Sequence, residues 1–285
     1  MAIKFEKVEF YYHPNTPFEH YALKNVNVNM ENGDFVAIVG HTGSGKSTLV
    51  QTINALLLPQ KGRILVDNYS VTNDKKKIDY KGLRKKVGLL FQFPEYQLFE
   101  ESVLKDVMFG PLNFGYDEEM ARQQSIDALK MVGIDESLFE KSPLELSGGQ
   151  KRRVAIAGVL SSNPDVIILD EPTSGLDPKG SKDIMNIFKE LNEKYGKTII
   201  LISHDMNIVN EYSTYVIAMK NGEVVYDGFP SSLFTNEKLL NELALTTPKI
   251  ISFILEMNKK GFNLDVKNIK SMDDLVACIV KEMRL

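Results

Sequence analysis

Short apolar runs alternate with stretches of helical periodicity along most of this 285-residue chain. Residues 35–39, 87–91 and 166–169 are nonpolar throughout, which is typical of strands covered on both faces. Apolar positions at helical spacing among charged residues predict helices over residues 117–132 and 179–194. Strands that alternate with helices form mostly parallel sheets with right-handed crossovers, so the pattern predicts an α/β fold.

Two regions depart from this alternation. Residues 3–12 alternate between apolar and polar with one slip near residues 6–7, and residues 26–30 alternate again. This period of two predicts half-exposed strands in an antiparallel β subdomain near the N-terminus. Residues from about 93 to 162 show no strand pattern, and we expect them to form an inserted helical subdomain.

The character of the chain changes again towards its end. Pro248 and Gly261 bound one expected helix, and residues 275–283 form a second behind a serine cap. We therefore expect a main domain over residues 1–240 and a small helical extension over residues 241–285.

Composition narrows the class of protein. With 43% hydrophobic and 25% charged residues, the chain is ordinary for a soluble globular protein. A net charge of -4 gives no general attraction to nucleic acid, so no nucleic-acid partner is expected. The chain begins without an apolar signal region and has no apolar run near the roughly 20 residues that span a bilayer, which predicts a cytoplasmic protein. Cys278 lies among apolar residues and is expected to be a buried structural thiol.

A basic stretch stands out against this balanced composition. Residues 75–86 hold seven lysine and arginine side chains. A solvated loop and a contact with a lipid surface both fit this density of charge.

A glycine-rich segment between the first buried strand and a helical stretch matches the pattern G-x-x-x-x-G-K-[ST]. Its residues are Gly40, His41, Thr42, Gly43, Ser44, Gly45, Lys46, Ser47 and Thr48. The glycines let successive backbone N–H groups converge on one phosphate at the start of the helix. Lys46 would reach the β- and γ-phosphates, and the Ser47 hydroxyl would bind Mg²⁺. The spacing and the flanking elements therefore predict a site for a nucleoside triphosphate.

An acidic pair, Asp170 and Glu171, follows the apolar run at residues 166–169. At the tip of a strand beside a phosphate loop, Asp170 is well placed to coordinate Mg²⁺ directly or through water. Glu171 can polarise an attacking water as a general base. The pair predicts hydrolysis of the bound nucleotide.

The segment Leu146-Ser147-Gly148-Gly149-Gln150 adds a second phosphate-binding element. Two glycines behind a serine at the start of a helix leave backbone N–H groups open to an anion. Together with the phosphate loop, the acidic pair, Gln92 and His204, this segment resembles the full motif set of ATP-binding-cassette (ABC) ATPases. The resemblance implies ATP and Mg²⁺ as cofactors and a head-to-tail dimer, in which residues 147–150 close over the ATP of the partner.

The same resemblance implies roles for single residues around the phosphates. Gln92 matches the glutamine that joins Mg²⁺ and water to the helical subdomain, and His204 matches the histidine that contacts the γ-phosphate. The expected catalytic residues are Glu171, His204 and Gln92. The expected Mg²⁺ ligands are Ser47, Gln92 and Asp170.

Further positions concern the binding of adenine and the formation of the dimer. Tyr12 matches the aromatic residue that stacks on adenine, and Tyr11 is the alternative on the other face of the strand. Asp177, in the loop at residues 174–177, matches the loop that crosses the dimer seam. The implied fold is that of an ABC-type P-loop NTPase: a RecA-like parallel sheet core, an antiparallel N-terminal β subdomain, an inserted helical subdomain and a small C-terminal α extension.

Finer resemblance points to one group within the ABC ATPases. Residues 87–99, 109–111, 245–248 and 260–262 are similar to the ATPases of energy-coupling factor (ECF) transporters, and to their second ATP-binding subunit more than to the first. That group imports vitamins and transition-metal ions. The resemblance implies a second ATPase subunit in a heterodimer or homodimer, a transmembrane coupling protein and a substrate-binding membrane protein.

The ECF resemblance also implies a place in the cell and surfaces for these partners. The chain is expected to sit peripherally at the cytoplasmic face of the membrane. Residues 93–104 are expected to receive the membrane protein, although their aromatic side chains could also simply pack the helical subdomain. The C-terminal extension is expected to contribute to dimer contacts.

A soluble ABC-type ATPase that acts as a mechanoenzyme is the alternative. DNA-repair relatives place long coiled coils between the phosphate loop and the signature, whereas here about 100 residues intervene without sustained heptads. Translation-factor relatives carry two cassettes in one chain. A GTPase would need an Asn-Lys-x-Asp motif, a small-molecule kinase would not need residues 146–150, and a regulatory cassette would be expected to lack Glu171 or His204.

Overall fold

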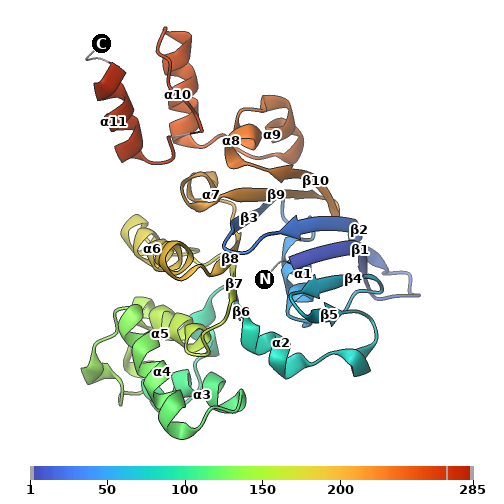
Figure 1. Ribbon diagram of the computed structural model, residues 1–285, viewed down its shortest axis with the longest axis vertical. Helices are drawn as coiled ribbons and strands as arrows, with labels where there is room; N and C mark the ends of the chain where they lie inside the picture. Colours follow the sequence, from blue (N-terminus) through green and yellow to red (C-terminus); the bar gives the residue numbers. More distant parts are fainter. Residues whose placement is uncertain (1–2, 268, 283–285) are drawn as a thin grey trace.

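The computed structural model describes residues 3–267 and 269–282, which form two sheets and the helices around them (Figure 1). The larger sheet has six strands in the order β10-β9-β3-β8-β7-β6. All neighbours pair in parallel except β10, which pairs antiparallel with β9. Its strands are β3 (Phe35–Val39), β6 (Val87–Leu90), β7 (Val166–Asp170), β8 (Thr198–Ile202), β9 (Tyr215–Lys220) and β10 (Glu223–Gly228). The predicted, mostly parallel sheet is confirmed.

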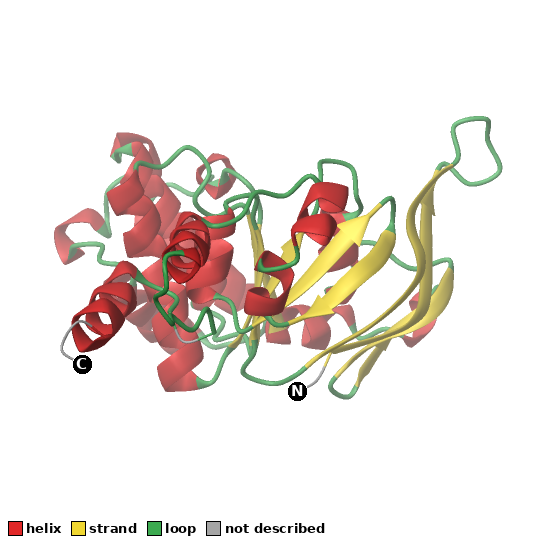
Figure 2. Cartoon of the chain, turned by 90° about the horizontal axis from the view of Figure 1, so that it is seen from above, coloured by secondary structure: helices red, strands yellow, loops and turns green. Residues whose placement is uncertain are grey.

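The smaller sheet is antiparallel and has the order β2-β1-β4-β5. It consists of β1 (Ile3–Tyr12), β2 (His20–Met30), β4 (Lys61–Val66) and β5 (Tyr69–Val71). The predicted slip in β1 is a register shift between Phe5 and Val8, where Lys7 has a positive φ of 51°. Figure 2 shows the strands towards one side of the molecule and most of the helices towards the other.

Helix α1 (Lys46–Ile53) is buried between the two sheets. Its Leu49 and Ile53 pack in one core with Phe5 of β1 and Ile38 of β3. Because α1 begins at Lys46, this packing fixes the phosphate loop that precedes it. The hydrophobic effect of burying such side chains, about 1.5–3 kcal/mol each, therefore holds the loop in place.

The inserted segment forms a helical subdomain, as predicted. Its main helices are α3 (Val103–Asn113), α4 (Glu118–Met131) and α5 (Gly148–Leu160). They share a second core with α6 (Pro178–Tyr195) and with the far face of the large sheet. Alternation in β7 divides the two cores, because Ile168 faces α1 whereas Ile167 and Leu169 face the helical side.

The C-terminal part is helical. The helices are α7 (Met206–Tyr212), α8 (Pro230–Phe234), α9 (Glu237–Leu243), α10 (Lys249–Lys259) and α11 (Met272–Glu282). Helices α8 and α9 follow the last strand and were not predicted. Helix α9 runs across the expected boundary at residue 240, and its Leu240 and Leu243 lie in one apolar cluster with Val39 of β3. The expected helix end at Met283 lies outside the described residues.

The basic stretch at residues 75–86 is not simply a loop. It contains a 3₁₀ turn at Lys75–Lys77 and the helix α2 (Tyr80–Lys86). Asp79 caps α2 by accepting from the Gly82 N–H at 2.9 Å, and Leu83 is fully buried. The cap and one buried leucine outweigh the repulsion among the lysines, so the prediction of a loop was wrong for this part.

Two smaller predictions can be compared with the structure. Cys278 is only partly buried, beside the small apolar cluster that joins α10 and α11. Within the described ranges, no helix combines the length and the apolarity needed to cross a bilayer.

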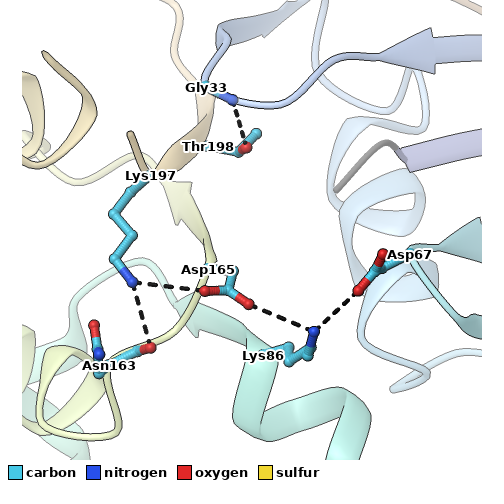
Figure 3. A network of polar contacts seen from close by, with 7 residues as sticks. All are labelled: Gly33, Asp67, Lys86, Asn163, Asp165, Lys197 and Thr198. Carbon is cyan, nitrogen blue, oxygen red and sulfur yellow. Dashed lines mark hydrogen bonds and ion pairs between the residues drawn. The ribbon is translucent and has the colours of Figure 1, made fainter. Parts of the chain in front are cut away.

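Charged residues connect the loops at the amino ends of the parallel strands (Figure 3). Lys86 precedes β6, Asp165 precedes β7 and Lys197 precedes β8. Asp165 lies 3.7 Å from the ammonium groups of both Lys86 and Lys197, and Lys86 also pairs with Asp67 at 3.0 Å. Since the phosphate loop and the acidic pair follow the carboxyl ends of β3 and β7, this network lies at the opposite edge of the sheet.

Candidate nucleotide-binding site

The phosphate loop can be built only with glycine at two positions. Gly40 and Gly45 have φ values of 144° and 103°, where other residues are strained. A Cβ atom on Gly40 would lie 2.2 Å from the Met219 carbonyl oxygen, and one on Gly45 would lie 2.3 Å from the Ala22 carbonyl oxygen. Backbone atoms of β9 and β2 therefore lie so close to the loop that a side chain at either position would clash.

Lys46 folds back over this loop. Its Nζ atom donates to the carbonyl oxygens of Gly40 at 2.7 Å and His41 at 3.0 Å. Burial lowers the pKa of Lys46, while the charges of Glu171 and Asp170 oppose that shift. The hydroxyl of Ser44 is buried and has no hydrogen-bond partner among the described residues. A half-buried ammonium group and an unpaired buried hydroxyl in one loop fit an anionic ligand such as a triphosphate.

Asp170 and Ser47 meet beside the lysine. Burial raises the pKa of the Asp170 carboxyl, and the nearby Ser47 side chain and the charge of Lys46 oppose the rise. A hydroxyl and a carboxylate oxygen are hard ligands of the kind that Mg²⁺ takes alongside phosphate oxygens, so the two residues fit this ion. Gln92 is exposed, two residues beyond the end of β6.

Glu171 directly follows β7 and is held in an unusual conformation. Its φ is 52°, only 8% of the residue is exposed, and its N–H donates to the Ile202 carbonyl at 3.1 Å. Its Oε1 atom lies 2.5 Å from Nδ1 of His204, whose side chain is 75% exposed.

The surroundings of Glu171 change its acidity. Burial and then the neighbouring Asp170 charge raise the pKa of Glu171 to about 7, and Lys46 and the His204 N–H oppose the rise. A carboxylate with a pKa near the working pH can take a proton efficiently and still be ionised. Strained backbone together with a shifted pKa is typical of catalytic positions.

The structure distinguishes between the two tyrosines at the end of β1. The hydroxyl of Tyr12 is hydrogen-bonded to that of Thr48 at 3.1 Å, and its ring packs edge-on against Phe10. Tyr11 instead packs against Tyr21, with 4.9 Å between the ring centroids. Tyr12 is therefore the tyrosine that lies beside the phosphate loop, and 37% of it is exposed.

Residues 147–150 form the start of α5 in the helical subdomain. Ser147 and Gln150 make a capping box: the Ser147 Oγ accepts from the Gln150 N–H at 3.3 Å, and the Gln150 Oε1 accepts from the Ser147 N–H at 2.9 Å. A Cβ atom on Gly148 or Gly149 would have no neighbour within 4 Å among the described residues, and neither glycine has a positive φ. Within the described part of the chain, nothing requires glycine at these two positions.

The structure thus brings together part of the predicted site. Lys46, Asp170 and Glu171 influence one another's pKa values, Ser47 acts on Asp170, and Glu171 contacts His204. Ser147 and Gln150 contact each other instead. Asp177 caps α6 by accepting from the Gly180 N–H at 3.1 Å.

Sequence reasoning missed Arg152, which is buried two positions after the capping box. Its guanidinium group contacts Glu95 and the carbonyl of Ser174. The sequence did contain a signal for it, because Arg152 falls on the same stripe of α5 as Ile156 and Leu160. A charge on an apolar stripe must be paired when it is buried.

The sequence of this chain is similar to those of known proteins. A sequence model described as "ABC transporter" matches residues 23–174, from β2 to the loop after β7. The chain belongs to the ABC transporter family. The matched residues include the phosphate loop, residues 146–150 and the acidic pair.

Relatives place the chain within that family. It is 49% identical over 264 residues to the energy-coupling factor transporter ATP-binding protein EcfA2 of Streptococcus agalactiae serotype Ia, covering 93% of this chain and 94% of that protein. It is 45% identical to EcfA2 of Enterococcus faecalis, covering 100% and 98%. The chain is therefore an ABC-type ATPase of the energy-coupling factor group, and the predicted resemblance is confirmed.

Solved structures agree with the fold. CbiO1 of Clostridium perfringens, described as part of the ABC transporter complex cbiONQ, matches with a TM-score of 0.72 and 41% identity, covering 89% of this chain and 98% of that one. The ATP-binding cassette MJ0796, as a post-hydrolysis dimer bound to ADP and Pi, matches with a TM-score of 0.71 and 36% identity, covering 80% and 98%. The predicted ABC-type P-loop NTPase fold is confirmed.

Proposed function

We propose that this ABC ATPase is the motor subunit of an energy-coupling factor transporter and drives the import of micronutrients such as vitamins or transition-metal ions. The observation that carries the hydrolytic part is Glu171, a buried carboxylate with a pKa of about 7 in contact with His204. The transport part is supported by relatives named as energy-coupling factor ATP-binding proteins, which match over nearly the full length.

Each group at the site has a task in this proposal. The backbone of residues 40–48 and Lys46 bind the triphosphate of ATP, and Ser47, Asp170 and Gln92 hold Mg²⁺, which neutralises phosphate charge when bound. Glu171 takes the proton of the attacking water. A general base of this kind contributes about 10²–10⁴-fold to the rate. His204 orients that carboxylate through Nδ1 and contacts the γ-phosphate.

A second ATPase subunit completes the site. Helix α5 begins with two glycines that nothing described in this chain requires, because their Cβ positions face open space and neither has a positive φ. Exposed N–H groups at a helix start attract phosphate, so we assign Ser147, Gly148 and Gly149 to the ATP of a partner, with Asp177 at the seam. A heterodimer is the expected form and a homodimer the alternative.

The surface for the membrane protein is assigned to residues 93–104. Tyr96 is 84% exposed, and Phe93 and Phe99 are exposed as well. Aromatic side chains left open in this way favour docking over internal packing, although Phe99 also packs edge-on against Phe109. A transmembrane coupling protein and a substrate-binding membrane protein would then hold the subunit at the cytoplasmic face.

Purification of the tagged chain from native membranes tests this assignment. We expect a second ATPase subunit and two membrane proteins to co-purify, and we expect the chain to leave the membrane fraction when the coupling protein is deleted. Recovery of the chain by itself from the soluble fraction would favour the soluble mechanoenzyme. Uptake assays with candidate vitamins and metal ions in that strain then identify the cargo.

A further inference from the structure

Arg152 is a buried charge on an otherwise apolar stripe of α5. It shares this stripe with Ile156 and Leu160, which pack in the core of the helical side, and only 2% of Arg152 is exposed. A charge taken out of water is tolerated when its donors are paired. The partners of Arg152 therefore indicate its role.

The guanidinium group bridges two segments that are distant in sequence. Its Nε and Nη2 atoms donate to the two carboxylate oxygens of Glu95 at 3.1 and 3.3 Å. Its Nη1 atom donates to the Ser174 carbonyl at 2.7 Å, and the ring of Phe93 lies 6.0 Å away. A planar guanidinium that holds a carboxylate at two points fixes direction as well as distance, which a lysine cannot do.

Both bridged segments belong to the machinery described above. Glu95 lies within residues 93–104, the segment assigned to the membrane protein, and its side chain is 19% exposed. Ser174 donates its N–H to the carbonyl of Glu171 at 3.2 Å. Hydrogen bonds therefore run without a gap from Glu95 through Arg152 and Ser174 to the backbone of the general base.

We propose that Arg152 is a positioning residue that carries a displacement of the turn at Pro94–Gln97 to the loop after Glu171. The inference rests on the proposed function in one respect, which is that a membrane protein docking on residues 93–104 displaces the turn. Because the pair with Glu95 is bidentate, Arg152 follows the turn, and the Ser174 carbonyl follows Arg152. Docking thereby adjusts the angle at which Glu171 meets its water.

Steady-state ATP hydrolysis by the purified ATPase pair tests the link. Arg152→Lys keeps the positive charge but loses the planar group that holds Glu95 at two points. Glu95→Gln keeps the shape of the side chain but loses its negative charge. For each we expect kcat to fall about 3- to 30-fold, as for other residues that couple sites, with KM for ATP unchanged within about twofold. The double variant should lose little more than either single variant, because both cut the same link.

Controls separate positioning from folding. Arg122→Lys, at an exposed arginine of α4, should leave kcat unchanged. Thermal unfolding of every variant shows how much protein is folded at the assay temperature. A fall in kcat that disappears after correction for unfolded protein, an unchanged kcat, or fully additive losses in the double variant would each overturn the positioning role.

A separate variant tests the docking surface. Tyr96→Ala should reduce co-purification of the membrane protein, since Tyr96 is exposed, whereas Arg152 hydrogen-bonds to Glu95 and Ser174. Unchanged co-purification would remove residues 93–104 from the proposed function, while the kcat of the isolated pair would still decide on Arg152. If Tyr96→Ala reduces co-purification but Arg152→Lys leaves kcat unchanged, the docking surface is retained and the positioning role of Arg152 is overturned.

Discussion

Glu171→Gln should make the isolated subunit more stable and inactive at the same time. Burial and the Asp170 charge raise the pKa of Glu171 from 4.5 to about 7 in the folded protein. In the unfolded chain the carboxyl ionises at its ordinary pKa, so between pH 4.5 and 7 the folded state binds more protons than the unfolded state. Stability is therefore lost as the pH rises through this window.

The magnitude follows from the size of the shift. A difference of about 2.5 pKa units corresponds to roughly 3 kcal/mol, at 1.36 kcal/mol per unit. Glutamine has nearly the same shape and no proton to lose, so the variant avoids this loss. We expect Glu171→Gln to exceed the wild type in free energy of unfolding by up to roughly 3 kcal/mol at pH 8, and the difference to vanish near pH 4.5.

Urea unfolding of the nucleotide-free subunit in EDTA at pH 5 and pH 8 measures this difference. Glu140→Gln, at an exposed glutamate, is the matched control and should show no change with pH. The same Glu171→Gln preparation should bind ATP as the wild type does and hydrolyse it about 10²–10⁴-fold more slowly. Equal effects on stability at both pH values, or turnover near the wild-type rate, would refute the description of Glu171 as a buried, ionisable general base.

Four further outcomes are expected. In the wild type, kcat/KM for ATP should decline as the pH falls below about 7, because the base must be ionised, and a flat profile would contradict this. Gly149→Ala should leave the stability of the subunit intact, since its Cβ meets open space, but should lower ATPase activity of the pair. Tyr12→Ala should weaken ATP binding by about 1–3 kcal/mol in calorimetry, and Tyr11→Ala should not. Asp165→Asn should reduce stability by at most about 1 kcal/mol in urea unfolding without changing ATPase activity.

Elements defined by local signals could be predicted from the sequence. The strand at Phe35–Val39, the glycines of the phosphate loop and the start of α1 lie next to one another in the chain, so their pattern can be read directly. The hairpin between β9 and β10 is similar, because Asn221 and Gly222 both have the positive φ that a tight hairpin needs.

Elements defined by distant partners could not be predicted in this way. Helix α2 is short and basic, and Arg84 reaches the carbonyl oxygens of Asn54 and Ala55, about 30 residues away in the chain. Helix α9 is only seven residues long and depends on the strands under it. Periodicity is weak over such lengths, and tertiary packing decides the structure.

The functional site was also predictable only where local motifs define it. Lys46, Asp170 and Glu171 follow from motifs, but the contact between Glu171 and His204 joins the ends of two neighbouring strands. The contact between Arg152 and Glu95 spans 57 residues. Strand order brings the first pair together, and the packing of α5 against a turn brings the second.

The buried residues Arg152 and Glu171 differ in how their charges are compensated, and this difference separates their roles. Arg152 has a carboxylate and a carbonyl as partners, so its charge is compensated and its value lies in fixed geometry. Glu171 is buried beside Asp170, and Lys46 and His204 compensate its charge only in part, so its pKa rises and its value lies in reactivity. A fold that needed only stability would pair both charges or replace both. Here Arg152 is paired, Glu171 is strained, and Ser174 joins the two. An ATPase needs such a link if an outside contact is to set the position of its general base.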